Sequence, residues 1–75
     1  MGKRPSSKEC LKLVRLEGFT QTVANRGGHM QFQHQDGRRT TVTLGYDEIP
    51  KKTFSLFLKE IKMDKKTFME YRKKL

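Results

Sequence analysis

The sequence predicts a small α+β domain in which helices cover one face of a three-stranded antiparallel sheet. Apolar residues recur at helical spacing near both ends of the 75-residue chain, and the middle alternates apolar and polar residues between glycine turns. The expected order is a helix, three strands, a second helix and a short last helix. We expect a single domain over residues 1–75, preceded by a loose basic arm at residues 1–5.

The first helix is expected at residues 7–17, because start and stop signals bracket an apolar stripe. Ser6 and Glu9 have the spacing of a capping box, in which each side chain accepts a hydrogen bond from a backbone amide at the helix start. Gly18 is placed to end the helix in the left-handed conformation. The apolar stripe consists of Cys10, Leu13 and Val14.

Three strands are expected to follow, at residues 20–25, 29–34 and 38–44. The first is rich in threonine and valine and is too short for a helix. Its inward face is ambiguous, and we assign Phe19 and Val23 to it.

The turn at Asp36 and Gly37 determines how the second and third strands pair. A two-residue loop would place Phe32 opposite Thr41 and would mix apolar and polar residues on both faces. A three-residue loop, closed by Gly37 in the left-handed region, places Phe32 opposite Thr40 instead. The apolar face then holds Met30, Phe32, Val42 and Leu44, and the polar face holds His29, Gln31, Gln33, Arg39, Thr41 and Thr43. Because the buried face fixes the register, we predict the three-residue loop.

The second main helix is predicted from apolar residues at i, i+3, i+4 and i+7, namely Phe54, Phe57, Leu58 and Ile61. Pro50 suits its first turn, whereas Thr53 is an alternative cap, so its start stays open. Asp64 is expected to cap the last helix. The apolar side of that helix is expected to carry Phe68, Leu75 and either Met69 or Tyr71.

The sequence has a formal net charge of +9, from 17 lysines and arginines against 8 aspartates and glutamates. Such an excess is typical of proteins that meet polyanions, most often nucleic acid. Cys10 is the single cysteine, which excludes an internal disulfide and favours a reducing compartment, so we expect a cytoplasmic protein. No apolar run approaches the length of a membrane span, and no membrane partner is expected.

His29 is the candidate catalytic residue. It follows the glycine pair Gly27 and Gly28 and is expected on the open face of the sheet, where its ring can exchange protons with a substrate. The alternative interpretation is a solvent-facing polar residue at the start of a strand. His34 is expected on the opposite face with a structural role. Because the two rings point apart and few carboxylates lie nearby, we expect neither a metal site nor a cofactor.

Several residues are expected to contact nucleic-acid phosphate. Lys51 and Lys52 lie near a helix start, where free amides also attract anions. The full expected set is Arg26, Gly27, Gly28, Arg38, Arg39, Lys51 and Lys52. The remaining lysines are interpreted as solvated helix faces.

The ordered motifs resemble those of the HicA toxin family, small ribonucleases of bacterial and archaeal toxin–antitoxin pairs with a double-stranded-RNA-binding-domain-like fold. The motifs are Glu17-Gly18-Phe19, Gly27-Gly28-His29, His34-Gln35-Asp36-Gly37-Arg38, Ile49-Pro50-Lys51-Lys52-Thr53-Phe54 and the cap from Asp64 to Phe68. The resemblance implies a metal-independent endoribonuclease that cleaves mRNA with His29 as general acid or base. It also implies a HicB-like antitoxin that covers His29.

One departure from the family leaves part of the mechanism open. Many relatives carry a proline and a second histidine after the third strand, where this chain reads Leu44-Gly45-Tyr46-Asp47. The complementary acid or base is therefore unassigned, with Tyr46, a lysine or water as options. The main alternative function is a non-catalytic RNA-binding module that recognises A-form shape and phosphate. A remoter alternative is a basic protein whose charge serves only a protein partner.

Overall fold

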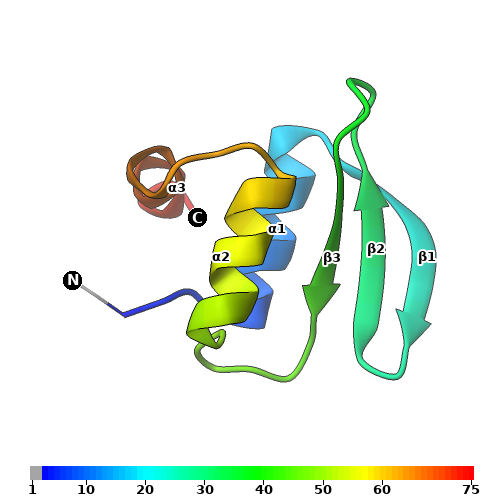
Figure 1. Cartoon of the computed structure of the whole chain (residues 1–75), viewed down its shortest axis with the longest axis horizontal. Helices are drawn as coiled ribbons and strands as arrows, with labels where there is room; N and C mark the ends of the chain where they lie inside the picture. Colours follow the sequence, from blue (N-terminus) through cyan, green and yellow to red (C-terminus); the bar gives the residue numbers. More distant parts are fainter. Residues whose placement is uncertain (1–2) are drawn as a thin grey trace.

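The computed structural model describes residues 3–75, apart from the side chains at positions 24 and 25. Its elements follow the order α1 (Ser7–Glu17), β1 (Thr20–Arg26), β2 (His29–Gln33), β3 (Arg39–Thr43), α2 (Lys51–Glu60) and α3 (Lys65–Arg72). The sheet is antiparallel, with β2 between β1 and β3 (Figure 1). The predicted α+β class is confirmed, and the arrangement is consistent with a fold like that of double-stranded-RNA-binding domains.

One face of the sheet is buried and the other is open. Phe32 and Val42 are each 1% exposed, and Thr40 is buried beside them. Both α1 and α2 contact β3, which places these two helices over the face that carries these side chains. Residues of the other face, including Gln31 and Gln33, are exposed. The helices therefore leave the face that carries His29 uncovered, as predicted.

The β2–β3 hairpin has the predicted register. Phe32 pairs with Thr40, and the His34 N–H donates to the Arg38 carbonyl at 2.8 Å, so the loop has three residues. Gly37 has a φ of 99°, in the left-handed region that glycine adopts without steric cost. Burial of the apolar face and the turn chemistry therefore select the same pairing.

The edge strand β1 departs from the prediction at one residue. Phe19 is buried as expected, but Val23 lies opposite Gln31, which belongs to the open face. The assignment of Val23 to the inward face was therefore wrong. The pairing shifts between Gln21 and Val23, and such a bulge changes which face the following side chains occupy.

Local signals define α1 as predicted. The Ser6 hydroxyl accepts from the Glu9 N–H at 3.2 Å, and the Glu9 carboxylate accepts from the Ser6 N–H at 2.9 Å. At the other end Gly18 has a φ of 104°, and the Phe19 N–H donates to the Val14 carbonyl at 2.9 Å. The capping box and the glycine stop therefore fix both ends of the helix.

The last helix, α3, extends the core beyond the two main layers. The Asp64 carboxylate accepts from the Thr67 N–H at 2.7 Å and caps it as predicted. Phe68 is fully buried and meets the rings of Phe54 and Phe57 edge to face. Figure 1 shows α3 on the side of α1 and α2 that faces away from the sheet. Leu75 lies beyond the helix end and is 36% exposed, so its predicted place on the apolar side was wrong.

The segment before α1 is held rather than loose. Pro5 is fully buried, and its carbonyl accepts from the Ile49 N–H at 2.8 Å. The Arg4 Nε donates to the Ile49 carbonyl, also at 2.8 Å. The expectation of a loose arm therefore fails at these two residues, because tertiary contacts with the loop before α2 fix them. Residues 1 and 2 of that predicted arm lie outside the described residues.

Candidate active site

A two-glycine turn positions His29. Gly27 has a φ of 57° and Gly28 a φ of 87°, so both central residues adopt the left-handed region typical of a tight hairpin. Arg26 and His29 pair across the turn and close it. The Gly28 carbonyl accepts from the Leu44 N–H at 2.7 Å, which ties the turn to the end of β3. The backbone on both sides of His29 is therefore fixed.

The His29 ring is exposed and has one side-chain neighbour within hydrogen-bond reach. His29 pairs with Thr43 of β3, and the Thr43 hydroxyl lies 3.5 Å from His29 Nδ1. Among the described residues, Nε2 has no hydrogen-bond partner. The arrangement can orient the ring through Nδ1 while Nε2 remains accessible to a substrate.

Cations gather at the end of the molecule that carries His29. Figure 1 places the β1–β2 turn at the same end as the starts of α1 and α2. Lys51 and Lys52 are the first residues of α2, and Arg26 flanks the glycine turn. All three side chains are exposed, and none forms an ion pair within the described part of the chain. The N-cap of α2, Pro50, makes no side-chain hydrogen bond to the first turn, which leaves amides open to an anion.

Tyr46 lies in the loop that follows β3. Its N–H donates to Ser7 Oγ at 3.1 Å, its carbonyl accepts from the Ser7 N–H at 2.9 Å, and Ser7 Oγ donates to the Thr43 carbonyl at 2.6 Å. These bonds fix the loop on α1 and leave Tyr46 41% exposed beside a hollow of about 270 Å³. Ser7 and Lys8, which border that hollow, were not anticipated from the sequence. Their contact with the distant loop is tertiary and has no local signature.

Arg38, expected to bind phosphate, lies at the opposite end of the molecule from His29. Its Nη1 donates to the Ile61 carbonyl at 2.6 Å, and its Nη2 lies 3.2 Å from the Glu17 carboxylate. Its Nε donates to Asp36 at 2.8 Å, and its guanidinium carbon is 5.0 Å from the centre of the Phe19 ring. The side chain is 13% exposed. It joins the hairpin to the ends of α1 and α2, and its nitrogens are occupied by partners within the fold.

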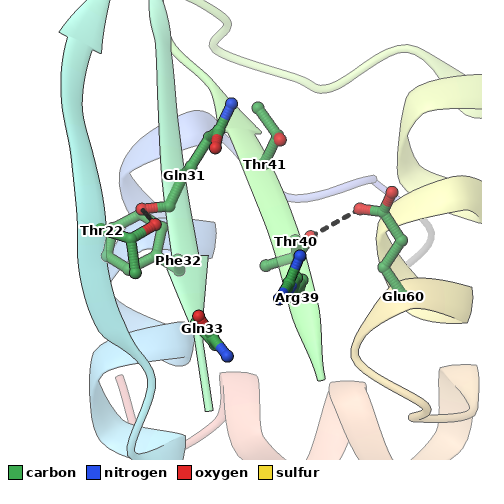
Figure 2. Close-up of a pocket in the computed structure, with 8 residues that line it drawn as sticks. All are labelled: Thr22, Gln31, Phe32, Gln33, Arg39, Thr40, Thr41 and Glu60. Atoms are coloured by element: carbon green, nitrogen blue, oxygen red, sulfur yellow. Dashed lines mark hydrogen bonds between the residues drawn. The ribbon is translucent and has the colours of Figure 1, made fainter. Parts of the chain in front are cut away.

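Arg39 is exposed on the open face and pairs with Gln33. It borders a groove of about 360 Å³ on that face (Figure 2). The groove is lined by Thr22, Gln31, Phe32, Gln33, Arg39, Thr40, Thr41 and Glu60. The predicted phosphate contacts therefore divide between the His29 end, which holds Arg26 with both glycines and both lysines, and this groove, which holds Arg39.

His34 closes the hairpin against α1. The Asp36 N–H donates to His34 Nδ1 at 3.1 Å, and Nε2 lies 3.2 Å from the Glu17 carbonyl. The same Nδ1 lies 3.1 Å from the Asp36 carboxylate, so both ring nitrogens have partners within the fold. The ring also packs edge to face on Phe19, with centroids 5.1 Å apart. These contacts fit a structural histidine.

Other possible reactive groups fall outside the site. Cys10 is fully buried, and burial raises the pKa of its thiol to about 12, which keeps it protonated and unreactive. Residues 3–75, apart from the two undescribed side chains, contain no cluster of three or more His, Cys, Asp or Glu side chains that could hold a metal ion. In the same part of the chain, no helix has both the length and the apolar character that a membrane span requires.

A family model describing the HicA toxin of bacterial toxin–antitoxin systems matches residues 7–63. The match runs from the first residue of α1 past the end of α2, and it includes His29, the glycine turn and the start of α2. It covers well over half of the chain and leaves α3 outside. No curated protein matches the sequence. The chain belongs to the HicA toxin family.

Proposed function

We propose that this protein is the toxin of a type II toxin–antitoxin pair and that it cleaves mRNA as a metal-independent endoribonuclease, with His29 as general acid or base. The observation that carries the proposal is the place of His29. Its ring is exposed on the uncovered face, at a tight glycine turn, within the segment that matches the toxin family. A histidine with a structural role would be expected to have hydrogen bonds and ring contacts within the fold, as His34 does.

The chemistry that fits this site is attack by a ribose 2′-hydroxyl on the adjacent phosphorus. A P–O bond forms to the 2′ oxygen, the P–O5′ bond breaks, and the product is a 2′,3′-cyclic phosphate with a free 5′-hydroxyl. His29 either removes the proton from the 2′-hydroxyl or gives one to the leaving 5′ oxygen. The contact of Nδ1 with the Thr43 hydroxyl favours proton exchange at Nε2.

Phosphate binding is assigned to the His29 end of the molecule. Arg26, Lys51 and Lys52 supply positive charge. Because glycine has no side chain, Gly27 and Gly28 let the RNA backbone come close to the turn. Tyr46 is the candidate for the complementary acid or base, because the bonds of its backbone to Ser7 hold it in the loop that follows β3 at this end.

The expected partner is a HicB-like antitoxin. An exposed catalytic histidine beside unpaired cations has to be blocked while the toxin is silent. An acidic protein laid over this end would bury the ring and neutralise the cations at once.

The second candidate function is an RNA-binding module without catalysis. It is favoured by the surroundings of His29, because no second acid or base contacts the ring among the described residues. The ribonuclease requires His29 to transfer a proton, whereas the binding module does not depend on this residue for catalysis.

Replacing His29 with alanine separates these functions. His29→Ala should keep the melting temperature of the parent, because an exposed ring buries little surface, and should still bind RNA. Its RNA cleavage should fall about a hundredfold or more, since a proton-transfer group is lost. Cleavage by the parent should survive excess EDTA. The measurement is the cleavage rate of purified proteins with matched melting curves, with His34→Ala as the control that loses more stability than activity. Equal rates for parent and His29→Ala would remove His29 from the mechanism.

A further inference from the structure

The groove on the open face has a lining that differs from that of the His29 end. Figure 2 shows Gln31, Gln33, Thr41 and Arg39 along β2 and β3, with Glu60 of α2 at the side. The Glu60 carboxylate accepts a hydrogen bond from the Thr40 hydroxyl at 2.8 Å, which fixes that wall. The side of the groove next to α2 is therefore fixed, and the exposed side chains of β2 and β3 that line it are polar.

The charge of this lining does not suit an RNA backbone. Arg39 is the one cation among the lining residues, and Glu60 is an anion, so the groove offers little net positive charge. Phosphate binding needs a series of cations, and such residues lie instead around the glycine turn and the start of α2.

The same lining suits the edges of unpaired bases. A glutamine amide offers one acceptor and two donors, which match the mixed donors and acceptors of a base edge. Among the described residues, neither the Gln31 nor the Gln33 side chain has a hydrogen-bond partner. Both amides are therefore free to bind a ligand without breaking a bond in the protein.

The strand places this groove in line with His29. Gln31 and Gln33 follow His29 by two and four residues, and alternate residues of a strand share one face. They lie roughly 7 and 13 Å from His29 along the strand, since each residue advances about 3.3 Å. Successive nucleotides of an extended single strand have a comparable spacing. A phosphate held at His29 would place its neighbouring bases over the groove.

We propose that this groove reads the bases next to the scissile phosphate. Gln31 and Gln33 hydrogen-bond the edges of unpaired nucleobases in single-stranded RNA, and Arg39 neutralises a phosphate at the far end. The inference rests on the proposed RNA substrate and deepens it, because it assigns sequence preference to β2 and positioning of the cleaved phosphate to the His29 end.

Selection of RNA by cleavage-deficient protein tests the groove without requiring catalysis. His29→Ala protein is mixed with a random single-stranded RNA pool, and the bound fraction is sequenced. A base preference at one or two adjacent positions should appear. It should fall about fivefold or more per position when Gln31→Ala or Gln33→Ala is added, because the amide contacts that discriminate bases are lost. The matched control is Gln35→Ala, which removes an exposed amide in the β2–β3 loop outside the groove and should leave the preference unchanged.

The outcomes separate this inference from the ribonuclease activity. A base preference that survives both groove substitutions, or a bound pool without any preference, would contradict base recognition by the groove. If the preference survives and the substitutions weaken only the complex with the cognate antitoxin, the face binds protein and the inference is also wrong. If the parent cleaves no RNA but the base preference depends on Gln31 and Gln33, the ribonuclease proposal is wrong and base recognition by the groove is supported.

Discussion

At the scale of single residues, Arg38 does most to hold distant parts of the chain together. Its guanidinium contacts the Glu17 carboxylate of α1 and the Ile61 carbonyl at the end of α2. The Glu17 carboxylate also accepts a hydrogen bond from the Tyr71 hydroxyl, so α3 joins the same network. Because these acceptors are partly buried, removing the guanidinium takes a charged donor from each of them.

Arg38→Ala should therefore lower the free energy of unfolding by about 1.5–3 kcal/mol, the usual contribution of hydrogen bonds to charged groups. The measurement is urea unfolding followed by circular dichroism. Arg39→Ala is the matched control, because Arg39 is exposed and makes no ion pair among the described residues. The stability of this variant should stay within about 0.5 kcal/mol of that of the parent. Equal losses for the two variants would contradict a structural role specific to Arg38.

Residue roles could be predicted from the sequence only where the cause is local. His29 could be placed on the open face because the alternation along β2 and the hairpin register determine it. Arg38 could not be separated from Arg39, because its partners come from the ends of two distant helices. Ser7 was missed for the same reason.

At the scale of elements, the sequence predicted those with their own start and stop signals. Both ends of α1 agree with the prediction because the capping box and Gly18 act within one turn. The face of β1 could not be predicted, because bulges depend on pairing with β2. The start of α2 stayed open between Pro50 and Thr53, and the structure begins the helix at Lys51, directly after Pro50.

The contribution of α3 can be tested at Phe68. This ring is fully buried between the core and the outer helix, although α3 lies outside the residues that match the toxin family. Phe68→Ala should lower the free energy of unfolding by about 3–5 kcal/mol, because it removes buried surface and leaves a cavity. Leu75→Ala, at an exposed position after the same helix, is the control and should change stability little. Phe68→Ala with the parent's stability would show that the core does not depend on α3.

The starts of α2 and α3 allow a matched test of phosphate binding. Both helices begin with Lys-Lys-Thr-Phe, at Lys51 and Lys65. The first turn of α3 is occupied by the Asp64 carboxylate, whereas Pro50 leaves the first turn of α2 open. An anion should therefore prefer α2.

In a His29→Ala background, changing Lys51 and Lys52 to alanine should weaken RNA binding and flatten its dependence on salt. The slope of log affinity against log salt should fall by about 0.7 for each phosphate contact that is lost. The same change at Lys65 and Lys66 should leave the slope near that of the parent. Affinities measured by fluorescence anisotropy across a salt series decide this. A larger effect from the α3 pair would place the RNA path over α3.

At the scale of the whole molecule, acidic and basic side chains have separate tasks. Most carboxylates are engaged inside the protein: Glu9, Glu17, Asp36, Glu48, Glu60 and Asp64 all accept hydrogen bonds. Their ion pairs are with arginine or histidine, and no described lysine forms one. Among the described residues, the fold therefore uses most of its acidic groups in internal hydrogen bonds and leaves the lysines outside its ion pairs.

Because these carboxylates are hydrogen-bonded in the folded protein, its stability should depend on pH. The hydrogen bond from Arg72 lowers the pKa of Glu9 below its ordinary value of 4.5, and Arg38 does the same for Asp36 through its backbone N–H and its guanidinium. A carboxyl whose pKa is lower in the folded state binds fewer protons there than in the unfolded chain. Its contribution to stability is therefore present above the unfolded pKa and is lost as the pH falls through the folded pKa.

The pairing of Glu9 with Arg72 joins the first and last helices, so it provides the test at this scale. The Arg72 Nε donates to Glu9 at 2.9 Å. The parent's free energy of unfolding should fall as the pH drops below about 4.5. Glu9→Gln should be less stable than the parent at pH 7, and the two should converge as the pH falls through the folded-state pKa of Glu9, because the parent's carboxyl then becomes protonated. Urea unfolding at intervals of half a pH unit measures both curves. Glu70→Gln, at an exposed position without an ion pair among the described residues, should follow the parent throughout. Curves for parent and Glu9→Gln that stay parallel throughout the acid range in which both remain folded would show that this pair does not couple the helices.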